Sequence, residues 1–194
     1  MQYLYPVIAY LLGSIPFGLI LSELFGKGHL RESGSKNIGT TNVMRTQGKL
    51  LGALTFLFDF GKGVAAVYFL QTSIPFINVL VAVAPVFGHM FPLWLKFKGG
   101  KGIATYFGVL SVLSPMTFAC AILVWVLAYV VTKISAVGGI LSAVISLPVF
   151  YYQKSANYSD FINLFYALIA LVVVIVFKHK ENIRRLINGN ELKV

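Results

Sequence analysis

Charged side chains are scarce in this sequence, and most of those present are positive. Only 11% of the 194 residues are Asp, Glu, Lys or Arg, whereas a soluble globular domain has about 25%. Hydrophobic residues make up 58% of the chain, and its mean hydropathy is +0.82. This composition excludes an ordinary soluble domain and predicts an integral membrane protein. No polar stretch is long enough for a second domain, so we expect residues 1–194 to form a single integral-membrane domain.

Carboxylate, thiol and imidazole groups are also few. The chain has 6 Asp and Glu residues, 3 histidines and one cysteine, and they are scattered along the sequence. Metal sites need several such ligands close together, so we predict no metal and no cofactor. The single cysteine, Cys120, excludes an intramolecular disulfide.

Several catalytic motifs are missing as well. The serine nucleophile pattern G-x-S-x-G does not occur. An H-x-x-x-x-D acyltransferase pair is absent, because none of the three histidines is followed by Asp at that spacing. The glycines and lysines of residues 98–102 do not match the P-loop pattern G-x-x-x-x-G-K-[ST], so nucleotide hydrolysis is not indicated.

Long apolar runs fill most of the chain and predict an all-α, polytopic bundle of about seven transmembrane helices. The fourth run is too short to cross untilted, so five full spans with buried partial helices is the competing count. Within the first run, residues 13–18 read G-S-I-P-F-G and predict a bend or a tight helix contact. The runs are Tyr3–Phe25, Leu51–Leu70, Phe76–Leu95, Gly102–Leu113, Pro115–Val131, Ala136–Tyr152 and Phe161–Phe177.

The distribution of Lys and Arg predicts the orientation of the bundle. With the N-terminus outside and the C-terminus in the cytoplasm, every Lys and Arg except Lys62 and Lys154 falls in or beside a cytoplasmic segment. This positive-inside bias explains part of the net charge of +10. It does not explain why the cations alternate with Gly, Ser, Thr and Asn.

Three basic segments with polar residues stand out: Gly34–Arg45, Phe97–Gly102 and His179–Leu186. The predicted orientation brings all three to the cytoplasmic face. Backbone N–H groups and fixed cations at a membrane surface suit a phosphate, including one that carries a fatty chain.

In the first segment, Gly34 and Gly39 allow backbone conformations that expose consecutive N–H groups to an anion. Arg45 can add a bidentate pair with a phosphate. An ordinary helix N-cap followed by a loop explains the same residues equally well. Four short side chains can also bond phosphate oxygens: Ser35, Thr40, Thr41 and Asn42.

The other two segments offer similar chemistry. Lys98 and Lys101 flank a glycine turn before a helix expected to begin near Ile103. The free N–H groups at the start of a helix form an anion site. The alternative is a flexible turn whose lysines only follow the positive-inside rule. His179 and Asn182 share one helix face, with Arg185 on the same side. A histidine near a helix end is more often a solvated or capping residue.

Asp59 and Lys62 lie three residues apart within the second apolar run. Ionisable groups at that depth are costly unless they pair or line a polar cavity. We expect a structural pair that stabilises the bundle.

Together these segments resemble the bacterial acyl-phosphate:glycerol-3-phosphate acyltransferase family, the PlsY type, nearly end to end. Residues 34–45 are similar to its first motif, G-S-G-N-[IV]-G-A-T-N-V-x-R, and residues 59–63 to its D-x-x-K-G. Residues 88–102 resemble its second motif, and residues 179–191 match the third, H-x-x-N-I-x-R-L-x-x-G-x-E. Two residues depart from the first motif. Lys36 replaces the second Gly, which would restrict a positive-φ backbone, and Thr40 replaces the Ala.

The resemblance implies transfer of a fatty acyl group from acyl-phosphate to the 1-hydroxyl of glycerol 3-phosphate, the first acylation of phospholipid synthesis. It implies a bacterial inner-membrane location with the site on the cytoplasmic side, and no nucleic-acid partner. A monomer is compatible with the sequence, and the oligomeric state stays open. The expected catalytic residues are Ser35, Arg45, Lys101, His179 and Asn182. The expected substrate-binding residues are Gly34, Asn37, Gly39, Thr41, Asn42, Lys98, Gly99, Gly100, Gly102 and Arg185.

The mechanistic hypothesis is direct attack without an acyl-enzyme, because acyl-phosphate is already an activated anhydride. Arg45 and the Gly34–Asn37 turn would hold the acyl-phosphate head, and the Gly99–Gly102 turn would hold glycerol 3-phosphate. His179 and Asn182 would orient the acceptor hydroxyl, and either His179 or a substrate phosphate takes its proton. Two rival classes stay open: a small membrane transporter for phosphorylated metabolites, and a regulatory lipid-binding subunit.

Overall fold

The computed structural model describes residues 1–154 and 161–193, and every regular element within them is a helix. Two short 3-10 turns, η1 (Gln2–Leu4) and η2 (Leu93–Leu95), accompany the longer helices. The α-helices are α1 (Tyr5–Gly13), α2 (Phe17–Leu24), α3 (Thr40–Gln47), α4 (Lys49–Phe69), α5 (Pro75–Met90), α6 (Ile103–Leu113), α7 (Pro115–Thr132), α8 (Ser135–Lys154), α9 (Phe161–Lys178) and α10 (Lys180–Ile187). The all-α prediction is confirmed.

The predicted spans correspond closely to these helices. Five of them (α4, α5, α7, α8 and α9) are long and apolar enough to cross a membrane, and α1 with α2 forms a sixth candidate if the bent pair counts as one span. The short fourth run forms α6, whose 11 residues rise only about 16 Å, against about 30 Å for a hydrocarbon core. The expected short helix therefore stands at the expected place in the chain.

The break between α1 and α2 is both a bend and a tight contact. The two helices meet at 41°, with Pro16 as the N-cap of α2. A side chain on Gly13 would strike the backbone of Pro85 on α5, and one on Gly88 would strike the backbone of Tyr10. Small residues therefore let α1 lie directly against α5, as membrane helices commonly do.

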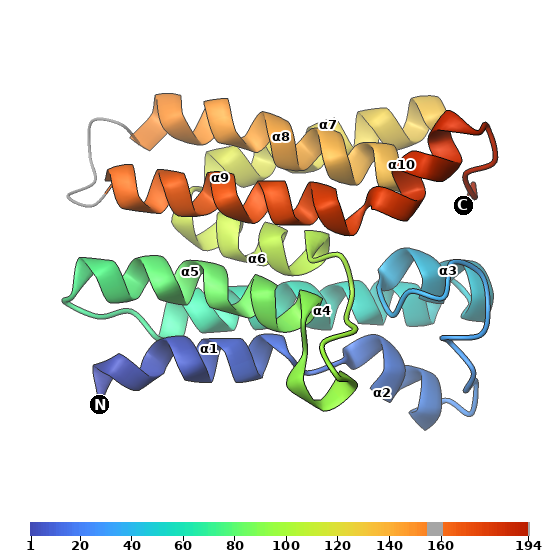
Figure 1. The fold of residues 1–194 in the computed structure, drawn as a ribbon, viewed down its shortest axis with the longest axis horizontal. Helices are drawn as coiled ribbons and strands as arrows, with labels where there is room; N and C mark the ends of the chain where they lie inside the picture. Colours follow the sequence, from blue (N-terminus) through green and yellow to red (C-terminus); the bar gives the residue numbers. More distant parts are fainter. Residues whose placement is uncertain (155–160, 194) are drawn as a thin grey trace.

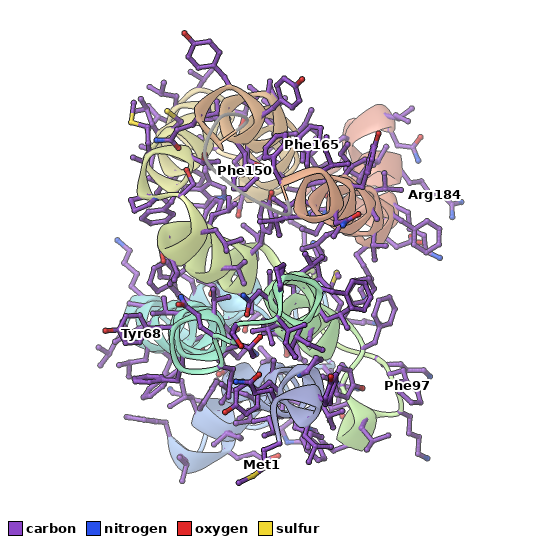
Figure 2. The ribbon with its side chains drawn as sticks, turned by 90° about the vertical axis from the view of Figure 1, so that its left-hand side faces the viewer. Met1, Tyr68, Phe97, Phe150, Phe165 and Arg184 are labelled. Carbon is purple, nitrogen blue, oxygen red and sulfur yellow. The ribbon has the colours of Figure 1, made fainter. Side chains whose placement is uncertain are left out.

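The helices form three layers, with α6 in the middle (Figure 1; Figure 2). On one side lie α7, α8 and α9, and on the other lie α4 and α5 with α1 beyond them. Tyr106, Phe107 and Leu110 of α6 are at most 1% exposed, so α6 forms the centre of the largest apolar cluster. Gly63 of α4 and Gly108 of α6 allow these two helices to touch through their backbones.

The three basic segments gather at one end of the bundle. Figure 1 shows α3, α10 and the C-terminus at the right-hand end, whereas the N-terminus lies at the left. The turn between α5 and α6 lies right of the middle of the picture, on the side of the bundle that carries α3 and α10. The convergence predicted from charge is therefore present. Which leaflet this end faces stays a prediction.

Candidate active site

A cavity of about 430 Å³ lies at this end, and all three basic segments contribute to its wall. The five residues expected to be catalytic all line it: Ser35, Arg45, Lys101, His179 and Asn182. Five of the expected binding residues line it too: Asn37, Gly39, Thr41, Asn42 and Gly102. The others lie outside the lining: Gly34, Lys98, Gly99, Gly100 and Arg185. Residues more than 140 positions apart in sequence, such as Ser35 and His179, thus face one space.

Asn42 organises the first basic segment from inside. Its side chain is buried, and its Nδ2 donates to the carbonyls of Leu30, Ser33 and Asn37 at 3.2, 3.1 and 2.9 Å. Its Oδ1 accepts the N–H of Ser35 at 2.8 Å. Both ends of the amide therefore hold the loop in place, and Asn42 positions this segment instead of presenting a free group to a ligand.

The backbone nest expected in this segment lacks the N–H groups of Ser35, Lys36 and Gly39. The N–H of Lys36 donates to Ser33 O at 3.0 Å, and that of Gly39 donates to Asn37 Oδ1 at 3.0 Å. With the Ser35 N–H bound to Asn42, these three N–H groups are used inside the loop and are not free for an anion. The cavity instead meets the N-terminus of α3, where Gly39 is the N-cap and no side chain caps the helix. A helix N-terminus attracts anions through its free N–H groups and its dipole.

Lys36 occupies the backbone conformation that its glycine counterpart would favour. Its φ is +59°, a left-handed conformation that costs a side-chain-bearing residue roughly 1–2 kcal/mol. The loop does require positive φ here, as suspected from the sequence. The Lys36 side chain is exposed and lies outside the cavity lining.

The glycines of the second segment serve packing. The N–H of Gly99 donates to Met90 O at 3.2 Å and that of Gly100 to His89 O at 3.0 Å. A side chain on Gly99 would strike the His89 backbone, and one on Gly100 would strike its imidazole. This corrects the expectation that both offer N–H groups to phosphate, because the turn is instead fastened to the end of α5. Lys98 is exposed, and its carbonyl accepts from Arg31 Nη2 at 2.8 Å.

Lys101 and the start of α6 carry the positive charge of this segment into the cavity. Gly102 is the N-cap of α6 with φ +89°, and no side chain caps the helix. Ile103 and Ala104 of the first turn also line the cavity. Burial lowers the pKa of Lys101 to about 8; Glu191 opposes this shift, and Arg185 and Arg45 add to it. The site therefore holds a cation that a bound anion would stabilise.

His179 is neutral at pH 7 and presents a hydrogen-bond acceptor. It is the N-cap residue of α10 and is only 2% exposed. Its Nδ1 lies 2.8 Å from Ile175 O, and because a carbonyl can only accept, Nδ1 carries the proton. Nε2, which lies beside Gly139 of the cavity wall, is then the acceptor. Burial, followed by the charge of Lys101, lowers the His179 pKa to about 4.

Asn182 lines the cavity and keeps one buried oxygen without a partner among the described residues. Its Nδ2 donates to Glu191 Oε1 at 2.7 Å, and Oδ1 is that unpartnered oxygen. The other oxygen of Glu191 accepts from Arg185 Nε at 2.7 Å. Arg185 is therefore paired with Glu191 and lies outside the cavity lining, and its expected contact with a substrate stays a prediction. Glu191 itself lines the cavity, and its place in the third motif was the only sequence signal for it.

Arg45 connects α3 to the C-terminal tail. Its Nε donates to Lys193 O at 3.1 Å and its Nη2 to Leu192 O at 3.3 Å. A guanidinium has five N–H donors, so others remain for a ligand. Burial lowers the pKa of Arg45, and the nearby Glu191 carboxylate opposes that shift.

The N-terminus of α8 is a part of the site that the sequence did not suggest. Ser135, Ala136 and Gly139 line the cavity, and Ser135 Oγ lies 2.8 Å from Thr41 Oγ1. A serine that opens a helix after a turn is too common a pattern to mark a site. With α3, α6 and α10, four helix N-termini now meet at one cavity.

Asp59 and Lys62 form the expected buried pair, at 2.8 Å. His89 joins them: its Nδ1 lies 3.4 Å from Asp59 Oδ1 and 2.9 Å from Lys62 Nζ. Lys62 Nζ also donates to Ile15 O, at the break between α1 and α2, at 2.9 Å. The cluster therefore ties α1, α4 and α5 together. Asp59 and His89 line the cavity, and no pattern in the sequence indicated that His89 joins the pair.

Another part of the cavity wall is apolar. Phe56, Phe107, Ile122 and Trp125 line it, and Trp125 stacks on Tyr129 with ring centroids 5.4 Å apart. These side chains come from α4, α6 and α7. One cavity thus joins a cationic, hydrogen-bonding wall to a hydrocarbon-lined wall.

Residues 3–189 match the model of a family described as glycerol-3-phosphate acyltransferase. The glycerol-3-phosphate acyltransferase of Brucella anthropi is 42% identical over 191 residues, which cover 97% of this chain and 90% of that protein. That of Pelagibacter ubique is 38% identical over 194 residues, covering 100% of this chain and 98% of that protein.

Two crystal structures of PlsY (YgiH), an integral membrane glycerol 3-phosphate acyltransferase, are similar to this chain. Its glycerol 3-phosphate form has a TM-score of 0.88 at 34% identity, covering 100% of this chain and 95% of that chain. Its lysophosphatidic acid form has a TM-score of 0.85 at 34% identity, covering 99% and 94%. The similarity therefore extends over the whole bundle, including the segments that form the cavity.

Proposed function

The chain belongs to the glycerol-3-phosphate acyltransferase family, and from this premise and the cavity we propose that it transfers a fatty acyl group from acyl-phosphate to the 1-hydroxyl of glycerol 3-phosphate. The products are 1-acylglycerol 3-phosphate and inorganic phosphate. The observation that carries the proposal is the single cavity whose one wall is cationic and whose other wall is apolar. Such a space suits a donor with a fatty tail and an anionic head beside a second phosphate.

Electrostatics is the main task of this site. Two dianionic head groups repel each other unless fixed cations and N–H donors neutralise them. Arg45, Lys101 and four helix N-termini face the cavity and can supply that neutralisation. We assign Arg45, with Ser35, to the acyl-phosphate head, and Lys101, with the start of α6, to the phosphate of glycerol 3-phosphate.

The acceptor hydroxyl has two matching partners. Asn182 Oδ1 and the neutral His179 Nε2 are both hydrogen-bond acceptors in the cavity wall. Such a pair suits a hydroxyl, which has a proton to donate, and does not suit a phosphate oxygen. His179 and Asn182 therefore orient the 1-hydroxyl toward the acyl carbon.

The reaction then proceeds by direct attack. The hydroxyl oxygen forms a bond to the acyl carbonyl carbon, the bond from that carbon to the phosphate oxygen breaks, and phosphate leaves. The hydroxyl proton passes to His179 or to a phosphate oxygen, whose charge is close by. Bringing two bound reactants together in this way supplies up to about 7–11 kcal/mol of the barrier reduction.

The cavity end belongs in the cytoplasm under this proposal, in the inner membrane of a bacterium. The cationic loops gather at this end, which agrees with the positive-inside rule. Fusing a reporter active only in the cytoplasm to the C-terminus would test the orientation. If the reporter were active when fused to the N-terminus and inactive at the C-terminus, the orientation would be the reverse.

The transporter alternative is not supported. A transporter needs a polar path through the membrane, whereas the polar residues of the cavity, apart from the buried Asp59 of α4, come from segments toward one end of the bundle. The family assignment also favours an enzyme.

Purified protein incubated with acyl-phosphate and glycerol 3-phosphate tests the proposal directly. We expect release of phosphate and formation of the 1-acyl product, and neither with acyl-CoA as donor. Arg45→Ala should abolish the reaction while the protein still folds. Acyl transfer from acyl-CoA but not from acyl-phosphate would contradict the proposed donor. An acylated protein trapped with a slow acceptor would contradict direct attack.

A further inference from the structure

Thr40 lines the cavity, and its hydroxyl is used by no other group in the described part of the chain. Its Oγ1 is shielded from solvent and has no hydrogen-bond partner in residues 1–154 and 161–193. The neighbouring hydroxyls of α3 are occupied: Thr41 Oγ1 pairs with Ser135, and Thr46 Oγ1 donates to Asn42 O at 2.8 Å. Thr40 is therefore the exception on its helix.

The position of Thr40 explains why the hydroxyl is unpaired. A threonine inside a helix can donate to a carbonyl of the preceding turn. Thr40 is the first residue of α3, and its N-cap, Gly39, has no side chain to accept a proton. The hydroxyl thus depends on something that enters the cavity.

The surroundings define what that ligand is. Thr40 lies at the positive end of the α3 dipole, and Arg45 and Lys101 face the same cavity. A hydroxyl donor in such a field suits an anionic oxygen, and hydrogen bonds to charged acceptors are the strong ones. Asn182 Oδ1, also buried and unpartnered, offers an acceptor elsewhere in the wall, so the cavity has complementary polar groups left open for a ligand.

We propose that Thr40 is a substrate-binding residue whose Oγ1 donates a hydrogen bond to a phosphate oxygen of a bound substrate. The motif that this segment resembles has alanine at this position. The inference rests on the proposed acyl transfer. The phosphate belongs either to the acyl-phosphate head or to glycerol 3-phosphate, and the two substrates are varied separately to distinguish them.

Thr40→Val keeps the shape of the side chain and removes the donor, whereas Thr40→Ser keeps the donor. We expect Thr40→Val to raise KM for one of the two substrates about tenfold, with kcat nearly unchanged, because the lost bond is made in both the ground state and the transition state. Thr40→Ser should restore KM to near the wild-type value. A rise in KM for acyl-phosphate assigns the hydroxyl to the donor, and a rise for glycerol 3-phosphate assigns it to the acceptor.

Thr105 offers a matched control. Its Oγ1 is equally buried and unpartnered, but it does not line the cavity. Thr105→Val should leave both KM values unchanged. Unchanged KM values in Thr40→Val, or a rise that Thr40→Ser does not reverse, would overturn this inference while leaving the acyl transfer standing. A wild-type protein without acyl transfer would instead overturn the proposed function.

Discussion

Asn182 Nδ2 donates to Glu191 Oε1 at 2.7 Å, and this contact determines which end of the amide faces the substrates. A carboxylate can only accept hydrogen bonds, so the amide nitrogen must point to Glu191, and the amide oxygen is left as the group available to a ligand. The second oxygen of Glu191 holds Arg185 at 2.7 Å. Glu191 therefore sets the polarity of Asn182 without needing to touch the hydroxyl that reacts.

Glu191→Gln should lower kcat by about 10- to 100-fold, because it weakens two hydrogen bonds to a charged group and allows the Asn182 amide to turn over. Steady-state kinetics in detergent checks this. Glu181→Gln, an exposed site on the same helix α10, is the control and should retain activity. Equal activity of the two variants would remove Glu191 from the positioning of Asn182.

The low pKa of His179 predicts how the stability of the unliganded protein changes with pH. The pKa is about 4 when folded, mainly because of burial, against about 6.5 when unfolded. Between these values the unfolded chain binds more protons, so protonation favours unfolding and stability falls as pH drops from about 6.5 to 4. The contribution of His179 to this loss is about 3 kcal/mol. Thermal unfolding of His179→Gln should show a flatter dependence over this window, and an identical slope would contradict the assignment.

The helices could be predicted from sequence because the bilayer imposes a simple rule. An apolar run such as Phe161–Phe177 must form a helix to satisfy its backbone, and α9 begins and ends within one residue of it. The contents of the loops obey no such local rule. The short helix α3 was not anticipated, because its sequence is polar and has an ordinary loop composition.

The site was predictable as a set of segments but not in its hydrogen bonds. The Ser35 N–H is missing from the expected nest because Asn42 accepts it, and local sequence does not reveal that hydrogen bond. His89 and Ser135 were missed because their roles depend on partners far along the chain, namely Lys62 and Thr41. Long-range contacts decide which polar atoms remain free for a ligand.

Lys101 should give the reaction an alkaline limit. Its pKa is lowered to about 8, chiefly by burial, so its charge is lost as pH rises through that value. We expect kcat/KM, which reports the free enzyme, to fall above about pH 8. Lys101→Arg, if it retains activity, should move this fall upward by more than one pH unit, since Arg stays protonated. An unchanged pH profile in Lys101→Arg would show that another group sets the limit.

Lys36→Gly should stabilise the protein. The left-handed φ of +59° favours glycine, and the gain, reduced by the greater freedom of glycine in the unfolded chain, is at most about 1 kcal/mol. Lys36→Ala removes the same charge but keeps the strained Cβ, so it should not stabilise. Thermal unfolding compares the two variants, and kcat should remain within about twofold of wild type because Lys36 is outside the cavity wall. Equal stabilisation by alanine would assign the effect to charge instead of backbone strain.

Removing one charge of the Asp59–Lys62 pair should be far more damaging than removing both. The Lys62 side chain is 1% exposed, so Asp59→Asn leaves a buried ammonium without a compensating carboxylate. Breaking such a buried pair lowers the free energy of unfolding by about 3–5 kcal/mol. The double variant Asp59→Asn with Lys62→Met removes the uncompensated charge, so it should recover much of that loss. Thermal unfolding in detergent measures all three proteins. Because Lys62 also donates to Ile15 at the α1–α2 break, the double variant should remain below wild type. If the double variant were less stable than Asp59→Asn alone, the buried lysine would be valuable for its hydrogen bonds and not for its pairing with Asp59.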